Sequence, residues 1–160
     1  MFIGINPAIT AQNDGHNFSN PTNRFWSVLH AAGFTDRLLR AQDEHILLHL
    51  GYGITTVVER PTNSARDIRA EEFVKARVSF EAKIRRYAPH SIAFLGKPAY
   101  FGLLGVRNAA WGRQPVDFAG SITWVLPNPS GRNRAFRFSD LVTAYAELRG
   151  SLKPTPFHSE

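Results

Sequence analysis

The chain has 160 residues, of which 43% are hydrophobic and 20% are charged, a balance typical of globular proteins and too apolar for a disordered one. Its 19 lysines and arginines outnumber its 13 aspartates and glutamates, so the net charge of +6 makes a polyanion one candidate partner among others. The absence of cysteine excludes disulfides, zinc sites with cysteine ligands and cysteine-bound iron–sulfur clusters.

Short apolar or β-branched segments alternate with amphipathic stretches along the chain. In chain order they predict a strand at 1–5, helices at 23–32 and 37–50, a strand at 53–58, a helix at 71–87, a strand at 91–95, a helix at 98–104, a strand at 122–126 and a helix at 139–152. A short extra strand at 116–119 is expected to pair antiparallel with 122–125 through Gly120. This order predicts an α/β fold, a single-domain α/β/α sandwich around a mainly parallel four-stranded sheet.

The two ends of the chain set the predicted boundaries of the domain. We expect one domain at residues 1–153 and a loose tail at 154–160. The first residues carry no basic segment followed by a long apolar one, so no signal peptide is predicted. Since no apolar run is long enough to span a membrane, we expect a cytoplasmic protein without a membrane partner.

A polar, loop-forming cluster follows each predicted strand. In an open parallel sheet, ligands bind beyond the carboxyl ends of the strands, where the connecting loops converge. We therefore expect these clusters to share one rim of the sheet. They are residues 4–7, 59–62, 96–98 and 127–131.

The first cluster places a neutral amide, Asn6, at a tight turn. Pro7 restricts Asn6 to extended conformations. The amide could orient a water molecule at the rim, or it could merely form an Asx turn. Both interpretations are open from these residues alone.

Four sequence blocks give the chain a specific resemblance to a known family. They are GINP at 4–7, NPTNRFW at 20–26, LGK at 95–97 and LPNPSG at 126–131. In these blocks and in their order, the chain resembles the mismatch-specific uracil/thymine DNA glycosylases, the group of bacterial mismatch-uracil and thymine-DNA glycosylases. The resemblance implies a uracil-DNA-glycosylase-like fold.

The same resemblance implies roles for residues around the flipped base. Asn6 would position the attacking water, and backbone donors near Ile5 and Phe18 would hold the base. Phe18 would stack on it, and Asn128 would contact it. Enzymes that extrude a base read it through such stacking and edge hydrogen bonds.

The loop at 128–134 resembles the family's penetrating loop, which fills the gap left by the extruded nucleotide. Arg132 stands where a bacterial relative carries an apolar wedge, although an arginine can also stack on a base or neutralise a phosphate. Lys97, Arg134 and Arg137 are candidate phosphate contacts, although as single residues each could equally be a solvated surface charge. The predicted DNA-binding residues are Lys97, Ser130, Gly131, Arg132, Asn133 and Arg134.

Other titratable residues offer further candidates. Asp67 follows the second strand and could support a cationic transition state or activate water, or it could be an ordinary acid at a helix N-terminus. Asp14 and His16 could act in acid–base catalysis. His45 and His49 have helical spacing beside Glu44, but they lack a clear third ligand, so no metal site is expected.

Together these observations predict a monofunctional DNA glycosylase of base excision repair. It would excise uracil, thymine or other damaged pyrimidines from mismatches with guanine, by water attack and without metal or cofactor. The partner would be double-stranded DNA with a mismatched or damaged base, bound by a monomer that is nucleoid-associated if bacterial. Two alternatives remain: a non-catalytic mismatch-binding protein of the same fold, and a small-molecule nucleosidase.

Overall fold

The fold is built on one five-stranded sheet, and the computed structural model describes residues 1–152 of the chain. The strands are β1 (Phe2–Gly4), β2 (Ile54–Thr56), β3 (Ser91–Leu95), β4 (Gly112–Arg113) and β5 (Ile122–Leu126). They lie in the order β2-β1-β3-β5-β4, where β4 is antiparallel to β5 and the other pairs are parallel. The tail predicted at 154–160 lies outside the described residues.

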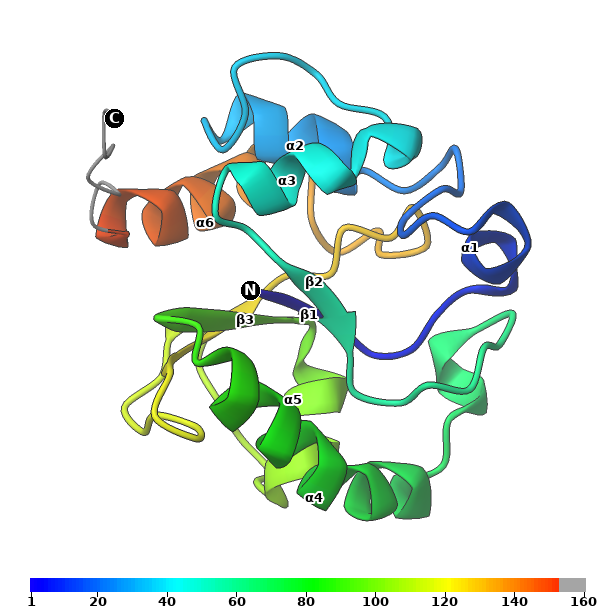
Figure 1. Ribbon diagram of the computed structural model, residues 1–160, viewed down its shortest axis with the longest axis vertical. Helices are drawn as coiled ribbons and strands as arrows, with labels where there is room; N and C mark the ends of the chain where they lie inside the picture. Colours follow the sequence, from blue (N-terminus) through cyan, green and yellow to red (C-terminus); the bar gives the residue numbers. More distant parts are fainter. Residues whose placement is uncertain (153–160) are drawn as a thin grey trace.

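Helices cover both faces of this sheet (Figure 1). One layer holds α2 (Phe25–Ala31), α3 (His45–His49) and α6 (Phe138–Ser151), and the other holds α4 (Ala70–Tyr87) and α5 (Lys97–Leu104). The short helix α1 (Ile9–Asp14) stands apart from both layers, beyond the carboxyl end of β1. The predicted α/β class, with its mainly parallel sheet, is confirmed.

Strand side chains alternate between the two layers, as expected where both faces of a sheet are buried. Phe2 packs with Phe25 and Tyr145 in one core, whereas Ile3 packs with Ile84 in the other. Of these five, Phe2 is 2% exposed and the rest are 0% exposed. The sheet is therefore a well-packed base for the loops at its carboxyl edge.

The sheet differs from the predicted one in its fifth strand. The predicted antiparallel edge strand at 116–119 instead lies at Gly112–Arg113, and 116–119 contributes only the isolated bridge between Phe118 and Ser121. The four-stranded count was wrong because β4 has only two residues, too few to show an alternating pattern.

Two helical predictions also need correction. The helix predicted at 37–50 is divided into a 3₁₀ turn at Ala41–Asp43 and the five-residue α3. The turn begins there because the backbone NH of Arg40 donates to the Asp43 carboxylate at 3.1 Å. Helix α1 was not predicted, since it buries no residue and so shows no apolar stripe.

Candidate functional site

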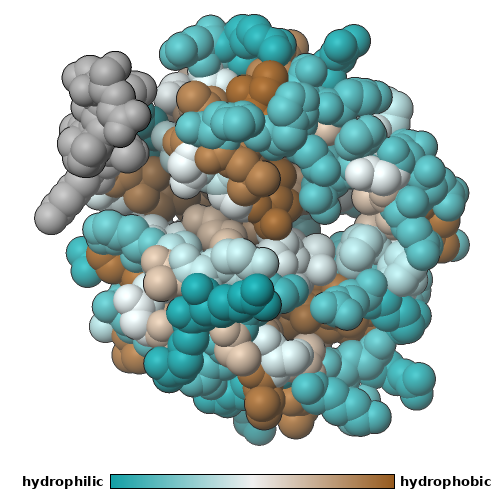
Figure 2. All heavy atoms as spheres, viewed as in Figure 1, coloured by the Kyte–Doolittle hydropathy of each residue, from teal (hydrophilic) through white to brown (hydrophobic). Residues whose placement is uncertain are grey.

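A cavity of about 660 Å³ opens at the carboxyl edge of the parallel strands. Its lining comes from four segments that are distant in sequence, within residues 4–11, 17–23, 62–66 and 128–133, and from Thr56 at the end of β2. Hydrophilic residues predominate on the nearby surface around α1 (Figure 2). A volume of this size is in the range of small-molecule sites and is larger than a cavity of about 210 Å³ at the opposite edge, beside Phe2 and Ser91.

The predicted rim is present, although one of its four clusters stays outside the lining. Gly96 backs Asn128 closely enough that a Cβ there would lie 3.4 Å from the Asn128 Cβ. The Lys97 side chain contacts Trp111 instead, with its ammonium 4.5 Å from the centre of the Trp111 ring. The structure therefore does not bring Lys97 to the cavity.

The Asn6 side chain is fixed by its amide nitrogen. Nδ2 donates to the carbonyl of Arg60 and to the Thr62 hydroxyl, both at 2.8 Å, and to the carbonyl of Pro7 at 3.1 Å. Thr62, 6% exposed, in turn donates to the carbonyl of Ser64 at 2.7 Å. No hydrogen bond among residues 1–152 occupies Asn6 Oδ1, so this oxygen can accept one from a water molecule in the cavity.

An ion pair stabilises the loop that holds Asn6. The guanidinium of Arg60 donates to both carboxylate oxygens of Glu72, at 2.7 and 3.0 Å, and also to the carbonyl of Asp67 at 2.9 Å. This hydrogen bonding by Arg60, with a backbone bond from Arg69, lowers the pKa of Glu72 to about 2. The Arg60 carbonyl, which accepts a hydrogen bond from the Asn6 amide, thus belongs to a residue whose side chain is itself held by hydrogen bonds.

The Asp67 side chain caps a short helical turn in the loop after β2. Its carboxylate accepts the backbone NH of Ser64 at 3.2 Å and caps the 3₁₀ turn at Ala65–Asp67. It is absent from the cavity lining, which contains its neighbour Arg66 instead. The structure does not bring the Asp67 carboxylate to Asn6, and the capping arrangement explains why an acid follows this loop.

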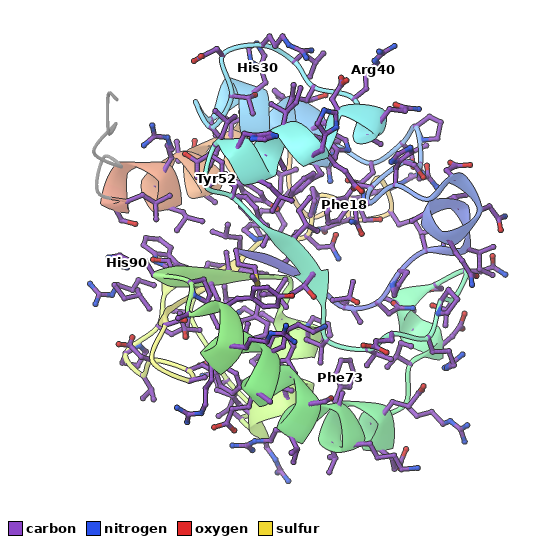
Figure 3. The ribbon with its side chains drawn as sticks, viewed as in Figure 1. Phe18, His30, Arg40, Tyr52, Phe73 and His90 are labelled. Carbon is purple, nitrogen blue, oxygen red and sulfur yellow. The ribbon has the colours of Figure 1, made fainter. Side chains whose placement is uncertain are left out.

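Phe18 lines the cavity from the loop between α1 and α2 and packs against the core on the side of the sheet that α2 and α3 cover (Figure 3). One face of its ring stacks on Phe25, with centroids 4.0 Å apart and an interplanar angle of 24°. Its backbone has a φ of 55°, unusual for a bulky residue. The preceding residue anchors it, because Asn17 donates to Glu44 through its backbone NH at 2.9 Å and through Nδ2 at 3.1 Å.

Ile5 and Asn128 line the cavity beside these residues. Ile5 is 7% exposed, and its carbonyl is occupied by the backbone NH of Val58 at 2.9 Å. The Asn128 side-chain oxygen accepts the NH of Ser130 at 2.9 Å. This bond orients the amide, and its nitrogen makes no hydrogen bond among those found in residues 1–152.

The β5–α6 loop (residues 127–137) forms another wall of the cavity. Ser130, Gly131, Arg132 and Asn133 line the cavity, whereas Arg134 and Arg137 are exposed outside its lining. The Arg132 guanidinium donates to the carbonyl of Asn63 at 3.0 Å and so reaches the facing wall. The sequence candidates on this loop are therefore brought together with Asn6 and Phe18, except for the two outer arginines.

Among residues 1–152, no aspartate or glutamate lines this cavity. Asp14 is exposed on α1, and His16 lies 3.8 Å from Glu44 beside a separate hollow. The structure thus gathers amides, hydroxyls, an aromatic ring and arginines, but no side chain that is a strong general base.

Three contributors to this site were given no role on sequence grounds. Thr62 fixes the Asn6 amide, Arg66 adds a second cation to the lining, and Arg24 binds the β5–α6 loop. Thr62 belongs to the polar cluster after the second strand and Arg24 to the NPTNRFW block, so both carried a signal. Arg66 is one of many surface arginines in the sequence, and nothing distinguishes it there.

Within residues 1–152, no group of three or more histidine, aspartate or glutamate side chains could hold a metal ion. Likewise, none of the helices in this part of the chain combines the length and apolar character needed to cross a membrane.

The family comparison covers nearly the whole of the fold and the site. Residues 1–149 match the model of the uracil DNA glycosylase superfamily. This range includes all four walls of the cavity and ends within α6. The chain therefore belongs to the uracil DNA glycosylase superfamily, whose membership indicates removal of uracil from DNA in base excision repair.

Proposed function

We propose that this protein is a monofunctional, mismatch-specific glycosylase that removes uracil or thymine from pairs with guanine in duplex DNA. The observation that carries the proposal is the composition of the cavity. An asparagine held by three acceptors faces it, and no carboxylate from the described residues 1–152 lines it. Such a site orients water but does not strongly activate it.

The chemistry follows from that composition. The bond between the sugar and the base breaks with the electron pair leaving on the base, and a water molecule oriented by Asn6 Oδ1 adds to the cationic sugar. The added water releases one proton to solvent and the departing uracil anion takes one up from solvent, so the products are an abasic site and free uracil. Backbone donors near Ile5 and Phe18, with the Asn128 amide, stabilise the negative charge that develops on the base.

Selectivity for mismatches follows from a weak chemical step. A base in a mismatch costs less to extrude than one in a Watson–Crick pair, so it spends more time in the cavity. Phe18 has one face on Phe25 and offers the other to the extruded base. Arg132 occupies the gap that the extruded nucleotide leaves in the duplex. Ser130, Gly131, Asn133 and Arg134 contact the DNA around this gap. Lys97, outside the cavity, contacts a phosphate.

The test is a substrate panel with purified protein. Duplexes with one G·U, G·T or A·U pair are incubated and treated with alkali, and strand breaks at the abasic site are measured; free deoxyuridine is assayed in parallel. The proposal predicts more breaks on the G·U and G·T duplexes than on the A·U duplex and no hydrolysis of the nucleoside. Mismatch binding without breaks would indicate a binding protein, and hydrolysis of deoxyuridine would indicate a nucleosidase.

A further inference from the structure

Arg24 makes an unusual set of hydrogen bonds with the β5–α6 loop. Its guanidinium donates to four backbone carbonyls, those of Pro129 at 3.4 Å, Phe136 at 2.8 Å, Ser130 at 3.0 Å and Asn133 at 2.8 Å. Its backbone NH also donates to the carbonyl of Pro129 at 3.0 Å. One residue just before α2 thus binds most of a loop that is more than a hundred positions away.

The four carbonyls lie on both sides of Arg132. Pro129 and Ser130 precede it, and Asn133 and Phe136 follow it. The planar Arg24 guanidinium therefore holds the two halves of the loop together, with Arg132 at the tip between them. Without such a tie, a loop free of regular secondary structure would sample many conformations, and ordering it on DNA would oppose binding.

Neighbouring contacts support the same arrangement. Gly131 approaches the 20–24 segment so closely that a Cβ would lie 2.6 Å from the carbonyl oxygen of Thr22. At the start of the loop, the hydroxyl of buried Tyr145 donates to the carbonyl of Pro127 at 3.0 Å. The carbonyls of Pro129 and Ser130, which Arg24 binds, lie in sequence between these two contact points.

The positive charge of Arg24 has no carboxylate partner among the ion pairs of residues 1–152. Its role there is to supply several donors in a fixed plane. A lysine carries the same charge, but it lacks the planar fork and cannot reach four carbonyls at once. Charge and shape can therefore be separated by one substitution.

We infer that Arg24 is a positioning residue that holds the β5–α6 loop in the conformation that enters the duplex, and that it acts through Arg132. The inference rests on the proposed function, because it assumes that this loop contacts DNA. By this inference, Arg24 raises the affinity for a duplex from which a base has been extruded and takes no part in bond cleavage.

The experiment compares Arg24→Lys and Arg24→Gln with Arg149→Lys as the matched control, since Arg149 donates to one loop carbonyl, that of Gly33 at 3.2 Å. The probe is a duplex with a stable abasic-site analogue opposite guanine, which measures binding without catalysis. Backbone hydrogen exchange and thermal unfolding are followed on the same proteins. Arg132→Ala and the double variant Arg24→Lys/Arg132→Ala complete the set.

We expect both Arg24 variants to lose affinity by about tenfold, the effect of losing charge-assisted hydrogen bonds, while the control keeps it. Exchange should accelerate at residues 129–136 but not in β3, and the loss of affinity in the double variant should be smaller than the product of the two single losses. Parental affinity in Arg24→Lys, multiplied losses in the double variant, or unchanged exchange in the loop would overturn the inference. If the parent binds this probe but excises no uracil, the proposed function fails while the role of Arg24 stands.

Discussion

The two sides of the cavity are held in different ways. On one side, the Asn6 amide is bound by three acceptors, and the loop that supplies two of them is fixed by the ion pair of Arg60 and Glu72. On the other side, the exposed Arg132 side chain makes one hydrogen bond, to the carbonyl of Asn63. Arg24 binds the carbonyls of Ser130 and Asn133, on either side of Arg132, and makes no hydrogen bond to Arg132 itself among those of residues 1–152.

Under the proposed function, this difference separates chemistry from recognition. A group that orients water contributes most when it needs no rearrangement, and Asn6 satisfies that condition in the free protein. Arg132 makes only this one side-chain hydrogen bond, from an exposed guanidinium to a carbonyl, so it can exchange the bond for a stronger one to a DNA phosphate. Substitutions on the Asn6 side should therefore change the rate, and those at Arg132 should change binding.

The largest effect is expected from Asn6→Ala. Loss of the oriented amide should lower the single-turnover rate on a G·U duplex by about 10²–10⁴-fold, with little change in DNA affinity. Asn108→Ala, which removes an exposed amide outside the lining, serves as the control. A parental rate in Asn6→Ala would remove the asparagine from the mechanism.

Phe18 should have the next largest effect. Phe18→Ala should weaken transition-state binding by roughly 1–3 kcal/mol, the value of one base–aromatic stack. Phe18→Leu keeps apolar packing against Phe25 but offers no π-face, so it should lose nearly as much in kcat/KM. If the leucine variant retains the parental kcat/KM, Phe18 only packs the wall and does not stack on the base.

Arg132→Ala should act on binding alone. Affinity for product DNA should fall, and the dependence of affinity on salt should flatten by about one charge. Arg77→Ala, on the exposed side of α4, is the matched control. An unchanged salt slope would show that the loop tip does not meet the DNA.

The smallest effect concerns acid stability. Because the pKa of Glu72 is lowered from 4.5 to about 2 in the folded protein, its ionised form stabilises the fold above pH 4.5, and this stabilisation is lost as the pH falls to about 2. Glu72→Gln should therefore unfold at a lower temperature than the parent near neutral pH, with a difference that shrinks in acid. A difference independent of pH would contradict the ion pair as its cause.

Much of this architecture could be predicted because it depends on local pattern and topology. The strands at 91–95 and 122–126 were predicted with the bounds that the structure has, since buried parallel strands leave continuous apolar runs. The rim followed from the rule that loops converge at the carboxyl ends of the strands. Asn6, Phe18 and Asn128 were then identified by resemblance, and the structure brings all three to one cavity.

What could not be predicted depends on side-chain direction and on distant partners. Asp67 follows the correct strand, but its carboxylate turns back to Ser64, a choice made by local capping. Lys97 belongs to a rim cluster, but it turns to Trp111, fourteen positions away. The contacts of Arg24 join segments separated by more than a hundred residues, and no periodicity or spacing in the sequence reports them.

The central claim is that a water-orienting amide without a carboxylate makes excision depend on how easily the base leaves its pair. The most direct test is the ratio of single-turnover rates on G·U and A·U duplexes of otherwise identical sequence, measured with saturating protein. The account predicts a rate on G·U that exceeds the rate on A·U by at least about tenfold, since a difference of about 1.4 kcal/mol in the cost of extrusion is enough. Equal rates on the two duplexes would contradict it.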